Sequence, residues 1–138
     1  MVLVLDASVA IGWVAETQAT PLSELALVAV NRESGLVPAH FGIEIARALR
    51  NRERRNLMTA DAVDSSLSQI RALQLRHDSA NPLDVVERAV VLARRHRLRV
   101  ADAAYLELAL RTGLPLATQD SALSRASIAA GVKLFGAD

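Results

Sequence analysis

Four acidic residues of this 138-residue chain stand where a metal-dependent reaction could use them. They are Asp6, Glu44, Asp102 and Asp120. Clustered carboxylates repel one another unless a cation is bound, and oxygen ligands without cysteine suit Mg²⁺ or Mn²⁺. Such an ion keeps several waters and binds phosphate oxygens of a substrate. The residues therefore predict hydrolysis of a phosphodiester bond by a metal-activated water, with one ion or two.

Each of these carboxylates also has a simpler explanation when it is considered alone. Asp6, Asp102 and Asp120 fall where helices are expected to begin, and aspartate is a preferred N-cap residue. Glu44 could pair on the surface with Arg47 or another nearby basic group. At about 100° per residue, however, Glu44 lies beside the stripe of its helix that is expected to be buried. A carboxylate at such a boundary needs a partner.

The residues VLVLDAS, which surround Asp6, predict the element that carries this carboxylate. The apolar run forms a buried strand over 2–5, and the small residues after Asp6 suit the start of a helix. A second apolar run, 114–118, ends close to Asp120 in the same way. Ligands of open α/β sheets bind at the C-terminal ends of strands. If these two strands are neighbours, the two carboxylates converge at one edge of the sheet.

Helix and strand signals alternate along the rest of the chain. Helices are predicted over 7–15, 21–35, 40–54, 60–73, from 82 into the basic run 94–99, and over 102–113 and 122–130; strands are predicted over 2–5, 36–38, 73–76, 114–118 and 132–135. The helix that begins at Thr20-Pro21 is expected to bury Leu22, Leu25, Ala26 and Ala29. The alternation predicts an α/β protein that is rich in helix, with a mostly parallel sheet covered on both faces.

The composition predicts one domain, residues 1–138, with a well-buried interior. Hydrophobic residues make up 51% of the chain and charged residues 22%. The absence of cysteine excludes disulfides, a thiolate nucleophile and cysteine-based metal sites. Asp6 interrupts the first apolar run, and no apolar stretch approaches the roughly 18 residues of a membrane span. We therefore expect a cytoplasmic protein without a membrane segment.

Every basic residue except Lys133 is arginine, and arginine suits bidentate contacts with phosphate. A basic strip follows Glu44 along its helix and is predicted to hold a nucleic-acid backbone: Arg47, Arg50, Arg54 and Arg55. The same residues could simply favour the helix dipole and keep the surface wet. That second reading is preferred for Arg94, Arg95, Arg97 and Arg99. The histidines, His40, His77 and His96, show no ligand spacing and are interpreted as surface or boundary residues.

Two hydroxyl residues stand two positions away from proposed ligands. Ser8 follows Asp6, and Thr118 precedes Asp120. Their hydroxyls could orient a carboxylate or a water by hydrogen bonding. They could equally be ordinary turn and cap hydroxyls.

Three segments resemble one known family. They are VLVLDAS at the start, HFGIEIARAL around Glu44, and VADAAYLELALRTGLPLATQDSALSRASIAAGVKLF near the end. Together they resemble the PIN-domain ribonucleases, in particular the VapC toxins of bacterial toxin-antitoxin pairs, over the whole chain. The resemblance implies a three-layer α/β/α sandwich, RNA cleavage that depends on Mg²⁺ or Mn²⁺, a homodimer, and a cognate antitoxin in the active-site groove. It places the acidic site on Asp6, Glu44, Asp102 and Asp120.

One position departs from the usual pattern of that family. Many relatives carry asparagine three residues after the helix glutamate, where this chain has Arg47. Arg47 could contact an RNA phosphate, pair with Glu44, or weaken the metal site. A second hypothesis therefore stays open, namely a PIN-like module with little or no activity that binds RNA or a partner protein. Other phosphate-binding folds are excluded, because the chain has neither a P-loop sequence nor a glycine-rich first turn.

Overall fold

The structure, a computed structural model, describes residues 1–137 and is built around a four-stranded parallel sheet. The strands are β1 (Val4–Leu5), β2 (Leu36–Val37), β3 (Arg76–His77) and β4 (Leu116–Ala117), in the spatial order β3-β2-β1-β4. Val4 of β1 lies opposite Leu36 on one side and Leu116 on the other. The first and last strands of the chain are therefore neighbours in the sheet.

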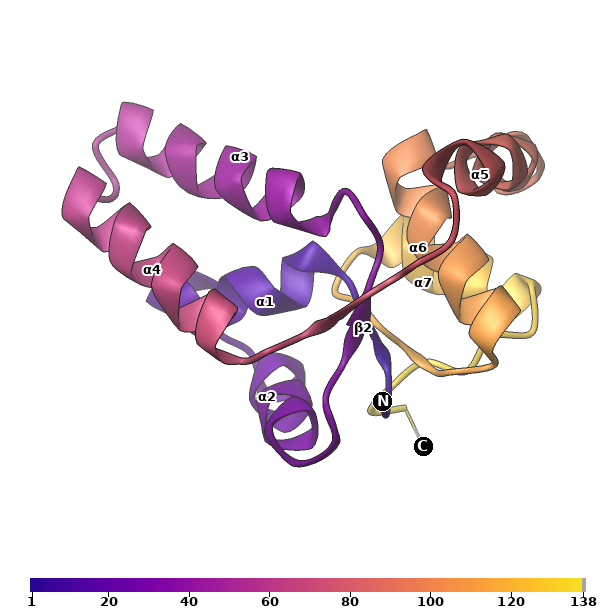
Figure 1. Ribbon diagram of the computed structural model, residues 1–138, viewed down its shortest axis with the longest axis horizontal. Coiled ribbons are helices and arrows are strands. Elements are labelled where there is room, and N and C mark those ends of the chain that lie inside the picture. The colour runs from indigo at the N-terminus through magenta and orange to yellow at the C-terminus, as the bar shows by residue number, and fades with distance from the viewer. Residues whose placement is uncertain (138) are drawn as a thin grey trace.

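Helices cover both faces of the sheet, so the predicted three-layer α/β/α sandwich is confirmed. Figure 1 shows α1 to α4 on one side and α5 to α7 on the other. Their bounds are α1 (Ala7–Val14), α2 (Pro21–Glu33), α3 (Phe41–Arg54), α4 (Ala60–Ala72), α5 (Pro82–His96), α6 (Val100–Thr112) and α7 (Ser121–Ala129), with a short 3₁₀ turn, η1 (Glu16–Gln18), after α1. None of the helices described is both long and apolar enough to cross a membrane.

Most predicted elements are present, with two differences at strands. The strand predicted over 73–76 lies slightly later, at β3. The strand predicted over 132–135 is reduced to one bridge between Leu116 and Leu134. Short strands have few hydrogen bonds of their own, so the pairing with a neighbour, which sequence does not show, decides where they begin and end.

Helix α2 begins as predicted but buries a different face. Thr20 and Ser23 form a reciprocal capping box at its start. The buried residues are Ser23, Ala26 and Val30, whereas Leu25 is 57% exposed, so the prediction that Leu25 is buried is wrong. The helix turns its small residues inward because it packs very closely against α1.

Gly12 of α1 makes this close packing possible. A Cβ atom at this position would lie 2.9 Å from Gln18 O and 2.9 Å from both Cβ and Oγ of Ser23. The next residue, Trp13, donates a hydrogen bond from Nε1 to Ser23 O at 2.6 Å. The contact matters for the site because α1 begins directly after Asp6, so its packing fixes the direction in which the chain leaves β1.

Helix α6 forms the centre of the opposite layer. Its residues from 102 to 109 are all buried, which is expected of a helix packed on every side. It contacts α5, α7, β1 and β4. Asp102 and Tyr105 both stand on this helix, so the core holds them in fixed positions.

An ion-pair network ties α6 to its neighbours. Arg111 of α6 binds both carboxylate oxygens of Asp78, just after β3, at 2.6 and 3.0 Å, and it also binds Glu107 at 2.9 Å. Arg88 of α5 donates to the same Glu107 at 3.1 Å. Burial favours the neutral form of Glu107, but the hydrogen bonds from Arg111 and Arg88 outweigh it and hold the pKa of this carboxyl below its usual value.

Replacing Gly12 tests the close contact between α1 and α2. We expect Gly12→Ala to lower the free energy of unfolding by about 1–3 kcal/mol, because the added methyl has no room. Gly42 is the matched control: a Cβ there meets no atom within 4 Å. Gly42→Ala should leave stability unchanged or raise it by up to about 1 kcal/mol. Urea unfolding followed by circular dichroism measures both, and equal stability of the two variants would contradict the packing described.

The pH dependence of stability tests the Glu107 network. A lowered folded-state pKa means that the stabilisation is present above the unfolded-state pKa of about 4.3 and is lost as the pH falls through the folded-state pKa. At pH 7 we expect Glu107→Gln to cost about 1–3 kcal/mol. Thermal melts from pH 7 to pH 3 should show this difference from the wild type shrinking. The exposed Glu87 of α5, changed to Gln, should cost little at any pH.

Candidate functional site

The four predicted acidic residues line one cavity of about 300 Å³. Asp6 follows β1 and Asp120 follows β4, and these two strands are neighbours. Glu44 lies in the first turn of α3 and Asp102 in the first turn of α6. Four helix N-termini, those of α1, α3, α6 and α7, thus bring the four carboxylates to one place at the edge of the sheet, where the positive ends of the helix dipoles favour negative charge.

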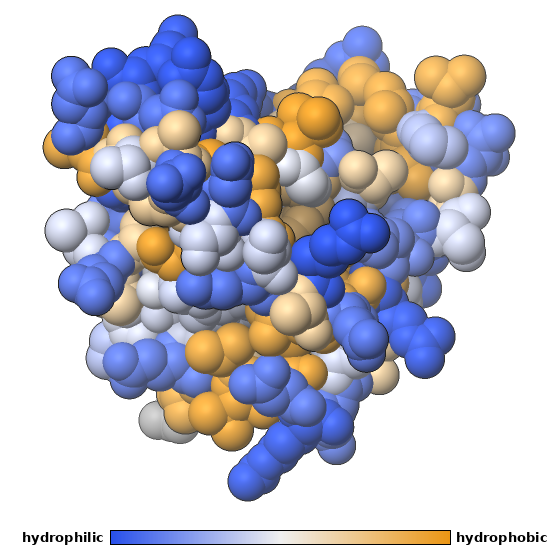
Figure 2. All heavy atoms as spheres, turned by 60° about the vertical axis from the view of Figure 1, so that its left-hand side comes forward, coloured by the Kyte–Doolittle hydropathy of each residue, from blue (hydrophilic) through white to orange (hydrophobic). Residues whose placement is uncertain are grey.

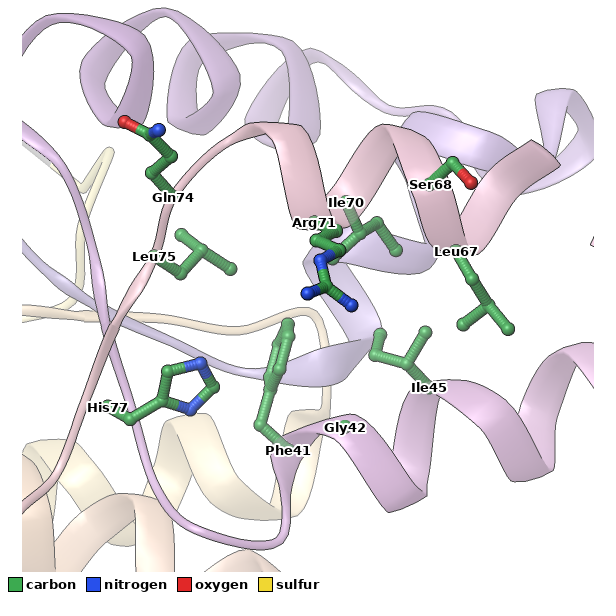
Figure 3. Close-up of a pocket in the computed structure, with 10 residues that line it drawn as sticks. All are labelled: Phe41, Gly42, Ile45, Leu67, Ser68, Ile70, Arg71, Gln74, Leu75 and His77. Carbon is green, nitrogen blue, oxygen red and sulfur yellow. The ribbon is translucent and has the colours of Figure 1, made fainter. Parts of the chain in front are cut away.

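A larger cavity lies elsewhere and has a different character. Its volume is about 570 Å³, and it lies between the start of α3, the end of α4 and β3 (Figure 3). Apolar side chains such as Phe41, Ile45 and Leu67 form much of its wall, and the guanidinium of Arg71 extends toward Phe41 and Ile45. None of the four carboxylates lines it. The chemistry of the lining, and not the volume, makes the smaller cavity the candidate site.

Asp6 is held by two hydroxyl groups. Ser8 Oγ donates to Asp6 Oδ2 at 2.6 Å, and Thr118 Oγ1 donates to the same oxygen at 2.7 Å. These hydroxyls accept in turn from the backbone N–H groups of Gln119 and Asp120, both at 3.0 Å. Asp6 stands at the N-cap of α1 but makes no capping hydrogen bond with its side chain. Capping therefore does not explain it.

The environment of Asp6 disfavours its charge. The residue is only 5% exposed. Burial raises the pKa of its carboxyl and the negative charges of Glu44 and Asp102 add to the rise, against the two hydroxyl hydrogen bonds, which lower it. A buried carboxylate with like charges nearby is a position where a cation is strongly favoured.

Glu44 is held by Tyr105 and His40. Tyr105, which is fully buried, donates from its hydroxyl to Glu44 Oε1 at 2.5 Å. His40 Nε2 lies 3.3 Å from the same oxygen and 2.9 Å from Ala101 O. Both neighbours of Nε2 are acceptors, so the proton of the ring is on Nε2 and is shared between them.

The titration behaviour of these three groups follows from their contacts. Burial would raise the pKa of Glu44, but the hydrogen bonds from His40 and Tyr105 and the charge of His40 lower it overall. Burial would lower the pKa of His40, but the hydrogen bond and the charge of Glu44 raise it. Burial and Glu44 together raise the pKa of Tyr105, so this hydroxyl stays a donor.

Sequence reasoning missed both partners of Glu44. His40 is half-buried, in agreement with its interpretation as a surface or boundary residue, but it also stands four residues before Glu44, a spacing that places two side chains together on a helix. Tyr105 stands three residues after Asp102 on the same helix, which was a second available signal. Its contact with Glu44 joins residues that are 61 positions apart. Local spacing could not supply that contact.

Asp102 and Asp120 have different local roles. Asp102 is the third residue of α6, and the N-cap is Arg99, so the capping explanation of Asp102 is wrong. Its Oδ2 accepts from Arg99 Nε at 3.1 Å. Asp120 does cap its helix, because Oδ1 accepts from the Leu123 N–H at 2.8 Å. Capping and another role can coexist in Asp120, since the cap uses one oxygen.

One pattern joins the four carboxylates. In each of them the protein holds one oxygen, namely Oδ2 of Asp6, Oε1 of Glu44, Oδ2 of Asp102 and Oδ1 of Asp120. Within residues 1–137 the second oxygen of each side chain makes no hydrogen bond. Four unengaged carboxylate oxygens around one cavity are a donor set that fits a hard divalent cation such as Mg²⁺ or Mn²⁺.

The acidic residues do not form a closed cage. In the part of the chain that the structure describes, no three acidic or histidine side chains already lie close enough together to hold an ion. An ion bound here would need water or substrate oxygens to complete its coordination, as Mg²⁺ usually does.

The predicted basic strip reaches the cavity only at its beginning. Arg47 lines the cavity. Arg50 instead pairs with Glu53 at 3.0 Å, Arg54 donates to Asn51 at 2.7 Å, and Arg55 ends the helix as its C-cap. On the opposite side Arg99 lines the same cavity, so its interpretation as a helix C-terminal charge is wrong.

The fold and the site together define an α/β protein with an acidic cavity suited to metal-dependent phosphate chemistry. The chain belongs to the PIN-domain family, whose model matches residues 3–129. It is similar to Ribonuclease VapC3 of Mycobacterium tuberculosis, in both strain CDC 1551 / Oshkosh and strain ATCC 25618 / H37Rv. In each case 35% of 125 aligned residues are identical, which covers 90% of this chain and 86% of the relative.

Replacing Tyr105 tests whether its hydrogen bond to Glu44 matters for cation binding. Tyr105→Phe keeps the ring in the core but removes the donor to Glu44. We expect about 10- to 100-fold weaker binding of Mn²⁺, because partners of a ligand commonly contribute that much. The rise in melting temperature across a Mn²⁺ titration measures the affinity without an activity assay.

Ser127→Ala is the control for this variant. Ser127 is fully buried in α7, and its hydroxyl donates to Leu123 O at 2.8 Å, away from the cavity. Both variants should lose about 1 kcal/mol of stability. Only Tyr105→Phe should lose affinity for Mn²⁺, and equal affinities in the two variants would contradict the role assigned to Tyr105.

Proposed function

We propose that this protein is a metal-dependent endoribonuclease that acts as the toxin of a toxin-antitoxin pair. The observation that carries the proposal is the set of four unengaged carboxylate oxygens around one cavity, in a chain of the PIN-domain family. The similarity to proteins named Ribonuclease VapC3 supports RNA as the substrate. The reaction is hydrolysis of an RNA phosphodiester bond.

In this proposal Asp6, Glu44, Asp102 and Asp120 hold Mg²⁺ or Mn²⁺, as one ion or two. A bound ion of this kind supplies an activated water and neutralises charge on the phosphate. The rest of the chain keeps the ligands in position. The Ser8 and Thr118 hydroxyls fix the buried carboxylate of Asp6 and leave its Oδ1 free.

The surroundings of the cavity suit an extended polyanion. Arg47 stands at its wall, and the exposed Arg50, Arg54 and Arg55 follow along α3. Arg50 and Arg54 already bind other side chains of α3. We therefore assign the direct phosphate contact to Arg47, whereas Arg50, Arg54 and Arg55 add positive electrostatic potential along the helix. Figure 2 is turned so that the side of the molecule with α3 and α4 comes forward. Strongly hydrophilic residues gather at the upper left of the face shown.

Two protein partners belong to the proposal. An antitoxin that places a basic side chain among the four carboxylates would occupy the site and block it, which suits the acidity of the cavity. Homodimerisation is supported by the exposed apolar residues of α5 and α6, among them Leu83 at 73%, Val91 at 50% and Leu110 at 42% exposure. Such a toxin acts in the cytoplasm, where its RNA substrates are.

The second candidate is a PIN-like module that binds RNA or a partner protein without turnover. Arg47 favours it, because a guanidinium in the cavity competes with a cation for the same carboxylates. Binding of RNA without cleavage under every divalent metal tried would favour this module over the nuclease.

Cleavage assays on a panel of RNAs test the proposal. We expect cleavage with Mg²⁺ or Mn²⁺ that is abolished by EDTA. Asp6→Asn and Asp102→Asn should each lower the rate at least about 100-fold, which corresponds to about 2.7 kcal/mol of barrier. The exposed Asp64 of α4, changed to Asn, should keep full activity. Full activity in Asp6→Asn would contradict the site.

A stability measurement separates loss of chemistry from loss of fold. Asparagine at position 6 can accept both hydroxyl hydrogen bonds while it removes a buried charge, so without metal Asp6→Asn should be at least as stable as the wild type. A gain of the order of 1 kcal/mol is expected. Mn²⁺ should raise the melting temperature of the wild type much more than that of the variant.

A further inference from the structure

Arg99 occupies a helix position at which arginine is unfavourable for the stability of the fold. It is the N-cap of α6 and makes no capping hydrogen bond with its side chain. Ser, Thr, Asp and Asn are preferred there because their oxygens accept from the free N–H groups of the first turn, which arginine cannot do. A cation at a helix N-terminus also opposes the helix dipole.

The contact of Arg99 with Asp102 does not compensate for this. The pair spans 3.1 Å, and although the Asp102 side chain is buried, the Arg99 side chain is 77% exposed, so water screens the guanidinium and the pair contributes little. A residue that breaks a local rule without a structural gain is commonly kept for function.

The geometry of Arg99 leaves half of its guanidinium available. Nε donates to Asp102, and within residues 1–137 neither Nη atom makes a hydrogen bond. The Nη1–Nη2 edge of an arginine is itself a two-donor fork that matches two phosphate oxygens. Arg99 lines the same cavity as Asp102, Asp120 and Glu44, so its guanidinium, which is always charged in proteins, lies at the acidic cluster.

We propose that Arg99 binds a phosphate of the RNA substrate at the rim of the acidic cavity, through its Nη edge, while Nε holds Asp102. The proposal rests on the nuclease function proposed above. Arg47 of α3 and Arg99 at the start of α6 both line the cavity that holds the four carboxylates, so two different helices each contribute a positive group to it. An RNA backbone held between two arginines passes directly over those carboxylates, which would otherwise repel it.

The alternative is that Arg99 only neutralises the acidic side chains. The two roles predict different results for Arg99→Ser. A phosphate contact predicts weaker RNA binding with an unchanged or higher melting temperature, because serine is a better N-cap. A neutralising role predicts a lower melting temperature, because the carboxylates then repel one another more strongly, and an unchanged salt slope of RNA binding, because no phosphate contact is lost.

The experiment measures binding of a fluorescein-labelled single-stranded RNA of mixed sequence by fluorescence anisotropy in EDTA. Binding is followed as the salt concentration rises from about 50 to 200 mM. Arg99→Ser should lower the affinity about tenfold and reduce the slope of log K against log salt by about 0.7, the share of one phosphate on a single strand. Its melting temperature should be unchanged or up to about 4 °C higher.

Two further variants complete the test. Arg97 is exposed, lies two residues away and adopts the left-handed conformation that asparagine tolerates, so Arg97→Asn removes the same charge without strain. It should change neither affinity nor slope appreciably. Arg99→Lys should restore the slope but only part of the affinity, because lysine keeps the charge and loses the fork.

The outcomes separate this inference from the proposed function. An unchanged slope in Arg99→Ser, an equal loss in Arg97→Asn, or no binding by the wild type in EDTA would each overturn the inference, and Mn²⁺-dependent cleavage would still uphold the nuclease. Loss of affinity in Arg99→Ser without cleavage by the wild type under any metal would overturn the nuclease and support Arg99 as an RNA contact.

Discussion

Electrostatic repulsion among four carboxylates at one edge of the sheet is the constraint on which the site depends. Asp6 and Asp102 are almost fully buried, and Glu44 and Asp120 lie nearby on the same cavity. Water cannot screen such charges as it screens those on an open surface. The protein stabilises each carboxylate with hydrogen-bond donors. The donors are hydroxyls for Asp6, a phenol and an imidazole for Glu44, a guanidinium for Asp102 and a backbone N–H for Asp120.

These donors can stay within hydrogen-bond distance of the carboxylates only if the helices that carry them are held rigidly, and the packing of the fold holds them so. Tyr105 reaches Glu44 because residues 102–109 of α6 are all buried and α3 starts across the cavity from them. Arg111 and Arg88 bind Glu107 on the same helix and so fix α6 against α5 and the end of β3. On the other face, Gly12 lets α2 press against α1 and sets the path of the chain after Asp6.

Sequence predicted local structure better than contacts between distant segments. Thr20 marks a helix start because a cap depends only on neighbours in the chain, and it does cap its helix, as Thr59 and Asn81 cap α4 and α5 in the structure. The cluster of four carboxylates needed more, because Asp6 and Asp120 meet only if the first and last strands are adjacent. Strand order depends on how helices pack over the sheet. The residues alone predict that these carboxylates converge only on the condition that the two strands are adjacent. The family resemblance is what supports that condition.

The predictions for Leu25 and Arg99, which the structure contradicts, also failed because the packing of helices and the exact position of a turn are not visible in the local sequence. Leu25 was expected inside because leucine is apolar, but close packing of two helices selects small residues, and Ser23 takes the inner position. Arg99 was grouped with the basic end of α5 because only a short turn separates α5 from α6. The position of that turn decides whether this arginine ends one helix or begins the next. Beginning the next one places it over the carboxylates, where its charge acts on the site and not on a helix end.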